Sequence, residues 1–370
     1  MKILFYTDQT YKHGGIERVL SNKINYLTQQ KNYKIHLLTT EQKNKQHCYL
    51  SNKKLITHDL GINYYRKLSY FHPRNLLKIP IHFFRLKKQL KHINPDIVIT
   101  PHYDFSFYFL PFLHKKSKKI KEYHSSKYFE SKNRNNNKSI FKNILYKLND
   151  FIESKYDNII ILTKDEKQHY KSNNTIVIPN GIDDISKQTA KLINKTAISA
   201  GRIAPVKGFD KLIDTWHIIA KKYPDWKLEI YGDGEATYIE KLQKQINKLN
   251  LQKQICLCGQ TDNLKDEMLE ASLYVMSSKT ECFPMVLLEA QSVGLPIVSF
   301  DCPYGPRNII TNNQDGILVE DQNNDKLANA IMILIENENI RIEMGQMAKL
   351  NIKKLQEKEV MNKWFKLFKA

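Results

Sequence analysis

The pattern of apolar and polar positions alternates between short apolar runs and longer amphipathic segments. KILFYT (2–7) and YKIHLLTT (33–40) are typical of buried strands, and the segment between them, GGIERVLSNKINYLTQQ (14–30), has apolar residues at helical spacing. Further strands are predicted in PDIVITPHYD (95–104), KKIKEYHSS (118–126) and YDNIIILTKDEKQHY (156–170), the last running into a helix. This alternation predicts an open parallel sheet in the first half of the chain.

A second series of strands and helices follows the turn-rich segment NNTIVIPNGIDD (173–184). It begins with the strand TAISAGRI (196–203) and the helix GFDKLIDTWHIIAKKYP (208–224), and it closes with two helices over about 323–367. We therefore predict an α/β fold of two Rossmann-like lobes that face a central cleft. The lobes are residues 1–180 and 181–350, and a C-terminal helix, 351–370, returns to the first lobe. Ligands of open α/β sheets bind at the carboxyl ends of the strands, so the cleft is the expected site.

The composition narrows the class of protein. The 370 residues are 41% hydrophobic and carry no apolar run near the 18 or so residues of a spanning helix, and the start, MKILFYTDQT, lacks the features of a secretory signal. Five cysteines without paired spacing predict neither a disulfide framework nor a zinc site. We expect a cytoplasmic protein.

Charge is distributed unevenly between the two halves. Residues 1–180 hold 33 Lys and Arg against 13 Asp and Glu, whereas residues 181–370 hold 25 of each, so the net charge of +20 lies in the first half. Such an asymmetry indicates an anionic partner for the first lobe: nucleic acid, a phospholipid surface or a phosphorylated substrate.

Candidate chemistry in the second half begins at the segment ECFPMVLLEAQSVG (281–294). Pro284 precedes the apolar helix, so the backbone N–H groups around Phe283, Met285 and Val286 form a potential anion site at a helix N-terminus. Glu281 before the helix and Glu289 within it are suited to accept hydrogen bonds from sugar hydroxyls. The structural alternative is a helix cap at Glu281 and a solvated Glu289.

Two other turns carry groups suited to phosphate. The segment GRIAPVKGFDKLI (201–213) places Arg202 and Lys207 on one strand-to-helix loop, where they would suit a diphosphate. Gly14 and Gly15 lie at an earlier strand-to-helix turn, where backbone N–H groups could touch a phosphate or sugar. Solvated loop charges and simple turn geometry are the alternatives. The glycine turn YGDG (231–234) lacks the dinucleotide fingerprint, so we do not expect a nicotinamide cofactor.

Taken together, these motifs resemble those of the retaining glycosyltransferases of family 4, which have the GT-B fold. The resemblance covers nearly the whole chain. It rests, in order, on GGIERVL, IPNGID, GRIAPVKGFDKLI, YGDG, the Glu-x7-Glu pair of ECFPMVLLEAQSVGLPIVSFDCPYGPRNII, and DGILV. Cys282 stands where many members have Gly, which narrows the space beside the sugar.

The resemblance implies a role for each candidate residue. Arg202 and Lys207 would hold the diphosphate of a nucleotide sugar, Glu289 its ribose and Glu281 the transferred sugar. The loop around Pro284, with the amides of Phe283, Met285 and Val286, would contact phosphate or sugar. Gly14 and Gly15 form the turn at which Gly15 would cover the β-phosphate from the other lobe.

The implied reaction is metal-independent and needs no cofactor beyond its donor. Fixed cations at the departing diphosphate favour the transition state, and the sequence has no Asp-x-Asp triplet of the metal-dependent transferases. His124, in KEYHSS (121–126), matches the active-site histidine of the family, although His-Ser replaces the frequent His-Asp. A histidine satisfied by backbone at a strand end is the alternative. CPYGPRNII (302–310) resembles members that use UDP-linked hexoses or N-acetylhexosamines to build capsule, lipopolysaccharide or other bacterial surface glycans.

The partner of the basic lobe is predicted from two segments. Residues 64–93 hold eight Lys or Arg, no acid and six aromatic rings besides His72, and residues 115–147 hold eleven Lys or Arg. This interfacial composition predicts peripheral binding to the anionic inner face of the cell membrane, with Arg85, Lys87, Lys88 and Lys91 on the membrane and acceptor face. A solvated basic surface is the alternative.

Three functions compete at this point. They are a glycosyltransferase acting on a lipid-linked or growing glycan, a GT-B nucleotide-sugar epimerase, and a nucleic-acid binder. The acid pair and the diphosphate cations favour the first two over nucleic acid, and the basic aromatic segments favour the transferase over the epimerase.

Overall fold

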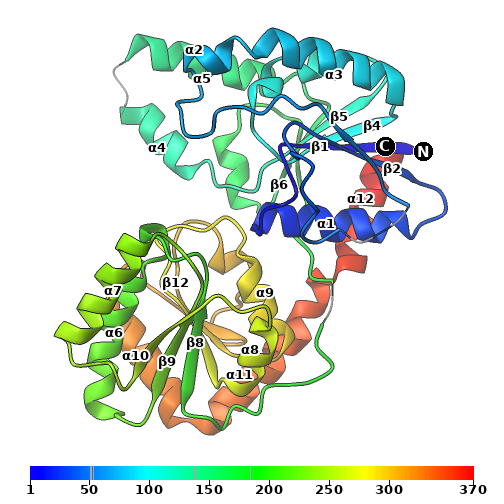
Figure 1. Ribbon diagram of the computed structural model, residues 1–370. Coiled ribbons are helices and arrows are strands. Elements are labelled where there is room, and N and C mark those ends of the chain that lie inside the picture. Colours follow the sequence, from blue (N-terminus) through cyan, green and yellow to red (C-terminus); the bar gives the residue numbers. More distant parts are fainter. Residues whose placement is uncertain (51, 53, 137–138, 184) are drawn as a thin grey trace. The chain divides into compact units, whose positions relative to one another are not determined.

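The computed structural model describes residues 1–370 except 51, 53, 137, 138 and 184. It divides into two compact units (Figure 1). Unit 1 comprises Met1–Pro179 and Met361–Ala370, and unit 2 comprises Asn180–Val360.

Unit 1 is built on a seven-stranded sheet of order β3-β2-β1-β4-β5-β6-β7, in which the neighbouring strands pair in parallel. The strands are β1 (Lys2–Thr7), β2 (Lys34–Thr39), β3 (Ile56–Asp59), β4 (Ile97–Thr100), β5 (Lys118–Glu122), β6 (Asn158–Ile161) and β7 (Thr175–Val177). The helices are α1 (Gly15–Thr28), α2 (Pro73–Leu76), α3 (Ile79–Ile93), α4 (Tyr128–Asn136) and α5 (Ile140–Glu153), with α12 (Glu357–Lys369) continuing from unit 2.

The periodicity of α1 explains why it packs on this sheet. Leu20, Ile24 and Leu27 recur at spacings of four and three residues and are fully or almost fully buried. Burial of one such side chain contributes about 2 kcal/mol. On the other side of the sheet, α3 contributes Leu86 and Leu90 to the core that also holds residues of β1 and β4 (Figure 1).

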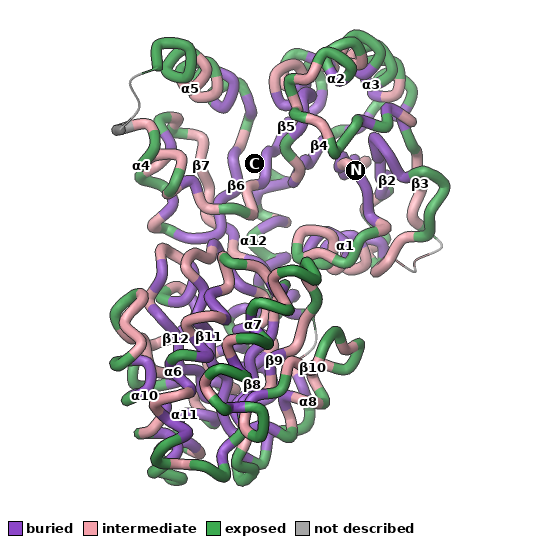
Figure 2. Tube along the Cα trace, turned by 60° about the vertical axis from the view of Figure 1, so that its left-hand side comes forward, coloured by how far each residue is buried: buried purple, intermediate pink, exposed green. Residues whose placement is uncertain are grey.

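Unit 2 is built on a six-stranded parallel sheet of order β10-β9-β8-β11-β12-β13. The strands are β8 (Thr196–Ala200), β9 (Lys227–Tyr231), β10 (Ile255–Gly259), β11 (Leu273–Met276), β12 (Ile297–Phe300) and β13 (Gly316–Val319). The helices are α6 (Phe209–Lys222), α7 (Ala236–Lys248), α8 (Leu264–Glu270), α9 (Met285–Ser292), α10 (Asn324–Glu336) and α11 (Glu338–Asn351). The strands β8, β11 and β12 are largely buried (Figure 2), and Trp216 of α6 packs in a core with Leu228 and Ile230 of β9.

These two parallel sheets confirm the predicted α/β class with two Rossmann-like lobes. The sequence did not predict β3 and β7, the edge strands of unit 1. The strand β3, with the sequence ITHD, lacks a continuous apolar run, and β7 has only three residues and lies in the segment interpreted as a turn-rich connection; both are at most partly buried. The helix expected after β6 is a short 3₁₀ turn, Asp165–His169, since the chain must turn back to β7 within a few residues. The C-terminal region forms three α-helices rather than two. None of the described helices has the length and apolar character needed to span a bilayer.

Candidate functional site

In unit 2, the loops that follow β8 and β11 are bonded to each other at the carboxyl edge of the sheet. Gly208 has a left-handed backbone, φ +66°, and a Cβ at this position would lie 2.1 Å from the carbonyl oxygen of Ser277, so glycine is required. The Ser277 hydroxyl donates to the Lys207 carbonyl at 3.1 Å, and the Lys279 N–H donates to the Val206 carbonyl at 2.8 Å. These contacts therefore fix the backbone position from which the Lys207 side chain extends.

Lys207 and Glu281, predicted from separate motifs, form an ion pair in unit 2. The distance from Lys207 Nζ to Glu281 Oε1 is 2.7 Å, and the same oxygen accepts a hydrogen bond from the Ser278 hydroxyl at 2.7 Å. The Lys207 side chain is 24% exposed and that of Glu281 is 11% exposed, so the pair is accessible from solvent. The stem of Lys207 lies beside Gly201, whose missing side chain leaves that space open.

The other predicted donor residues of unit 2 lie on the same two loops and on α9. Pro284 is the N-cap of α9 and has no side chain that could cap the helix, so the first amides of α9 remain available to an anion. Phe283 is buried, whereas Met285, Val286 and Glu289 are half-buried on α9. Arg202 is exposed on the loop that also carries Lys207. Gly305 allows close packing behind the site, because a Cβ there would lie 2.6 Å from the Glu281 Cβ.

In unit 1, His124 belongs to a buried ion network at the end of β5. Its Nε2 lies 3.2 Å from Glu122 Oε2, and the Lys23 ammonium of α1 lies 2.6 Å from the same oxygen. Burial would raise the pKa of the Glu122 carboxyl, but the Lys23 ammonium and the His124 ring outweigh burial and lower this pKa to about 2. Lys23 also lies 4.0 Å above the Trp364 ring, which ties α12 to the network.

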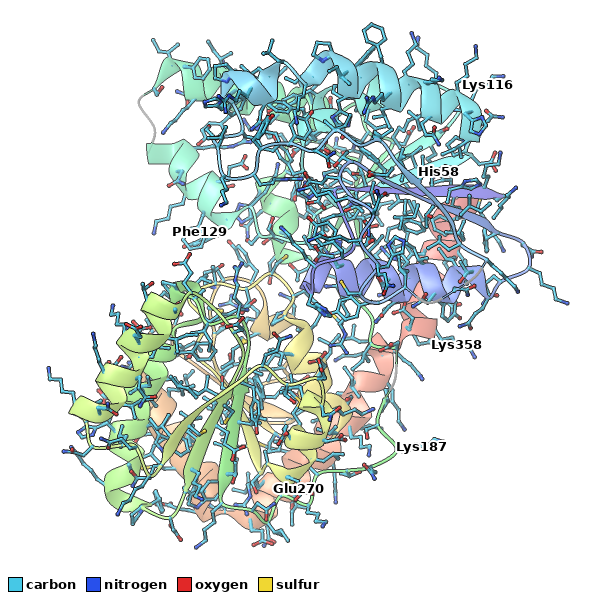
Figure 3. All side chains as sticks on the ribbon, in the orientation of Figure 1. His58, Lys116, Phe129, Lys187, Glu270 and Lys358 are labelled. Atoms are coloured by element: carbon cyan, nitrogen blue, oxygen red, sulfur yellow. The ribbon has the colours of Figure 1, made fainter. Side chains whose placement is uncertain are left out.

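His124 lines a pocket of about 400 Å³ within unit 1. The pocket is formed by the start of α1, the segments after β4 and β5, and helices α4 and α5, and Figure 3 shows the side chains around these elements, with Phe129 of α4 at the periphery. Ile16, which follows the predicted Gly14–Gly15 turn, is one of its lining residues. The structure therefore brings the glycine turn of α1 and His124 to one place.

The four cations predicted for the membrane and acceptor face lie on α3 and are not among the lining residues of this pocket. Lys87, Lys88 and Lys91 are exposed. Arg85 already has partners within unit 1: its guanidinium donates to the carbonyls of Leu60 at 2.7 Å and Gly61 at 3.2 Å.

Several pocket residues were not identified from the sequence. The polar run after β4, His102 and Tyr103, offered a signal, since residues at the carboxyl ends of parallel strands commonly bind ligands. Lys121 also offered one: it is a lysine within a strand, and it is buried. Glu153 gave no signal, because α5 brings it back to the pocket from a distant part of the chain.

Two Rossmann-like parallel-sheet units, with candidate site residues at the strand ends, are the architecture of GT-B proteins. Residues 13–185 match the family described as Glycosyltransferase Family 4, and residues 181–351 match Glycosyl transferases group 1. The chain therefore belongs to the glycosyltransferases that combine these two domains.

Individual relatives agree with this assignment. The chain is 33% identical over 213 residues to a Haemophilus influenzae protein named as an uncharacterized glycosyltransferase, a match that covers 56% of this chain and 60% of that protein. It is 29% identical over 226 residues to poly(ribitol-phosphate) alpha-N-acetylglucosaminyltransferase of Staphylococcus aureus, covering 59% of this chain and 45% of that protein. The chain thus spans less than two thirds of the length of these relatives.

Solved structures share the fold over the full chain. The crystal structure of TarM aligns with a TM-score of 0.79 at 18% identity, covering 100% of this chain and 99% of that one. Anabaena HepE in complex with UDP aligns with a TM-score of 0.79 at 17% identity, covering 100% of both chains. These likenesses confirm the predicted GT-B fold.

Proposed function

We propose that the protein transfers a hexose or N-acetylhexosamine from a UDP-sugar to a lipid-linked or growing glycan in bacterial surface polysaccharide biosynthesis, with retention of the anomeric configuration. The observation that carries this proposal is the accessible Lys207–Glu281 pair beside the uncapped N-terminus of α9. This arrangement combines a cation and helix amides suited to a diphosphate with a carboxylate suited to sugar hydroxyls.

The ion pair suggests how the donor is received. When the donor diphosphate binds the Lys207 ammonium, the ion pair between Lys207 and Glu281 breaks. Glu281 Oε1 can then accept hydrogen bonds from the hydroxyls of the donor sugar. Arg202 supplies a second cation, and Glu289 accepts from the ribose. As negative charge grows on the departing diphosphate, these fixed cations and the amides of α9 stabilise the transition state. The proposal assigns His124 and Gly15 to the same donor, as the family resemblance implies.

The names of relatives support the class of substrate. They include poly(ribitol-phosphate) alpha-N-acetylglucosaminyltransferase, poly(glycerol-phosphate) alpha-glucosyltransferase of Bacillus subtilis, and an amylovoran biosynthesis glycosyltransferase of Erwinia amylovora. Structures of HepE are described with UDP and with UDP-glucose. These names favour a UDP-sugar as donor and a surface polymer as acceptor.

The location we propose is the anionic inner face of the membrane. Helix α5 exposes a row of large apolar side chains: Ile140, Phe141, Ile144, Leu148 and Phe151. Phe71, Leu77 at the C-cap of α2, and Ile81 and Phe84 of α3 are also exposed. These three helices lie on the same side of unit 1, opposite α1, in both Figure 1 and Figure 2.

Charge on these helices supports the same partner. The exposed cations of α2, α3 and α5 are Arg74, Arg85, Lys87, Lys88, Lys91, Lys142 and Lys147. Apolar residues that can enter an interface, flanked by lysine and arginine, match an anionic lipid surface. Part of the predicted aromatic content does not contribute, because Tyr64 is buried in the core.

The test of the activity is incubation of the full chain with UDP-glucose, UDP-galactose, UDP-N-acetylglucosamine and GDP-mannose. We expect slow release of nucleoside diphosphate and free sugar from one of the UDP-sugars, undiminished by EDTA. NMR of the transferred product would give the anomeric configuration. Release of no nucleotide from any donor would contradict the proposal, and a product that keeps its nucleotide but changes the sugar configuration would establish the epimerase alternative.

A further inference from the structure

The loop after β12, residues 301–308, contains a backbone conformation that its residue type disfavours. Tyr304 has φ +130°, whereas the other non-glycine residues with positive φ in the described part of the chain lie between +47° and +61°, in the ordinary left-handed region. A bulky residue at φ +130° is strained. Such strain persists only where the surrounding contacts hold it in place, and it is concentrated at functional sites.

Hydrogen bonds within the β12 loop hold Tyr304 in this conformation. The Asn308 side-chain amide donates to the Tyr304 carbonyl at 2.5 Å, and the Tyr304 N–H donates to the Cys302 carbonyl at 3.1 Å. The Arg307 guanidinium donates to both carboxylate oxygens of Asp301 at 2.8 Å, which joins the two ends of the loop. The β12 loop therefore has a fixed shape.

The residues on either side of Tyr304 contact Glu281 of the candidate donor site. The Glu281 N–H donates to the Pro303 carbonyl at 3.4 Å, and Tyr304 itself forms a single parallel β-bridge with Glu281. A Cβ at Gly305 would lie 2.6 Å from the Glu281 Cβ and 3.0 Å from Pro284 Cδ, so the loop backbone lies directly against the site. Because both neighbours of Tyr304 are held at Glu281, the φ angle of Tyr304 has little freedom to relax.

We propose that Tyr304 is a positioning residue for Glu281. Its strained backbone allows Pro303 and Gly305 to contact Glu281 together, and these contacts fix the direction in which the carboxylate reaches the donor sugar. The backbone contacts matter most once the diphosphate has bound Lys207, because Glu281 then loses that ion-pair partner. This inference rests on the proposed function, since it names the residue that orients the sugar-binding carboxylate.

The strain can be measured without a donor, by differential scanning calorimetry of the full chain carrying Tyr304→Gly or Tyr304→Ala. Both variants lack the ring, but only glycine adopts φ +130° without steric cost. We expect the midpoint of thermal unfolding of Tyr304→Gly to lie about 2–4 °C above that of Tyr304→Ala. Equal midpoints would overturn the proposal, because residue 304 would then be unstrained.

A kinetic comparison tests whether the strain serves catalysis. Tyr304→Gly should lower kcat for UDP-sugar hydrolysis about tenfold relative to Tyr304→Ala with little change in donor KM, because a relaxed loop lets the carboxylate move from the reacting sugar while the diphosphate contacts remain. The matched control compares Asn250→Gly with Asn250→Ala. Asn250 also has a positive φ, +58°, but it precedes β10 at the opposite edge of the sheet, so the two variants should have equal kcat.

A double variant assigns the effect to Glu281. If Tyr304 acts through this carboxylate, the difference in kcat between Tyr304→Gly and Tyr304→Ala should largely disappear in the Glu281→Gln background. A tenfold difference that persisted there would overturn the proposal, as would equal kcat values for the two single variants of an active enzyme. If wild type hydrolysed none of the UDP-sugars, the proposed function itself would be overturned, and with it the role of Tyr304.

Discussion

The two candidate sites of this protein are constructed in different ways. In unit 2, backbone geometry does most of the positioning: Gly208 and Gly305 permit close approach of loops, and the main ion pair, Lys207–Glu281, remains partly exposed. In unit 1, the site depends on buried side chains from distant elements, and the Lys23–Glu122 pair is only 6% and 2% exposed.

Under the proposed function, we expect this difference to correspond to two kinds of recognition. A diphosphate is the same in every UDP-sugar, so loops and helix amides serve many donors with little change. Acceptors differ in shape, and a pocket of side chains can change its specificity residue by residue. We therefore expect variants of unit 2 to affect any donor, and variants of the unit 1 pocket to affect stability or acceptor choice.

The largest effect is expected from breaking the buried network of unit 1. Glu122→Gln removes a charge that two buried groups depend on, and loss of one partner of a buried pair typically costs about 3–5 kcal/mol. Urea unfolding followed by circular dichroism would measure this loss. The control is Glu320→Gln, because the pair that Glu320 forms with Lys326 is fully exposed to solvent and should contribute far less to stability. Equal losses of unfolding free energy in Glu122→Gln and Glu320→Gln would show that burial does not distinguish the ion pairs of the two units.

Acid should weaken the same network in wild type. The pKa of Glu122 in the folded protein is about 2, below its ordinary value of 4.5, so its contribution is complete above about pH 4.5 and is lost as the pH falls towards 2. The shift corresponds to about 3 kcal/mol. Unfolding free energies measured between pH 6 and 3 should fall less steeply in Glu122→Gln than in wild type. If the unfolding free energies of wild type and Glu122→Gln fell in parallel over this pH range, the low pKa assigned to Glu122 would be contradicted.

In unit 2, Lys207→Ala should lower kcat/KM for UDP-sugar hydrolysis on the order of 100-fold, as removal of one transition-state donor does. Arg202→Ala should also weaken donor use, and both variants should fold, since neither residue belongs to the core. Lys221→Ala, an exposed lysine of α6, is the control. Wild-type turnover in both Lys207→Ala and Arg202→Ala would refute the diphosphate assignment.

The same contrast explains what the sequence could predict. The donor motifs of unit 2 are local, because a glycine turn, a cation and an acid pair lie within short segments such as 201–213 and 281–289. The α/β class followed from the apolar strands. The unit 1 pocket could not be derived in this way, because Ile16, Lys121 and Glu153 come from α1, β5 and α5 and line one pocket only through the topology of the sheet.

Pairing also changes what a residue type indicates. Lys119 and Lys121 were counted in the basic segment 115–147 predicted to bind the membrane, but both are buried, and burial lowers the pKa of each to about 8. Arg85 looked like a free surface cation but binds two backbone carbonyls. Neither partnership has a local sequence signal, since each depends on which carbonyls the fold leaves nearby.

Within unit 2, the two carboxylates should have separable effects of about tenfold. Glu281→Gln should lower kcat, because this carboxylate is assigned to the reacting sugar, whereas Glu289→Gln should chiefly raise the donor KM, because it is assigned to the ribose. Glu281→Gln also removes the charge partner of Lys207, so its effect should shrink in the Lys207→Ala background. Initial rates over a range of UDP-sugar concentrations would test both statements, and matching profiles would show the roles to be misassigned.

The smallest effect per residue is expected at the proposed membrane surface of unit 1. Each exposed lysine near an anionic bilayer contributes about 1 kcal/mol, so Lys88→Gln should weaken binding to phosphatidylglycerol-containing vesicles about fivefold. Replacing Lys87, Lys88 and Lys91 together should weaken it further and lower activity on a lipid-linked acceptor, while UDP-sugar hydrolysis is spared. Arg85 is left in place, because its contacts with Leu60 and Gly61 are structural.

Two comparisons assign the cause of that binding. Lys244→Gln on α7 of unit 2 is the matched control and should leave cosedimentation unchanged. Ile144→Ser together with Leu148→Ser, on the exposed row of α5, tests the apolar contribution. Exposed charges are largely screened beyond about 8 Å at physiological ionic strength. Raised salt should therefore release the wild-type protein from vesicles if electrostatic attraction dominates binding, and should leave it bound if insertion of apolar side chains dominates. If neutral and anionic vesicles bound alike and the triple lysine variant cosedimented like wild type, the basic surface of unit 1 would be solvated, and the acceptor would not require a membrane.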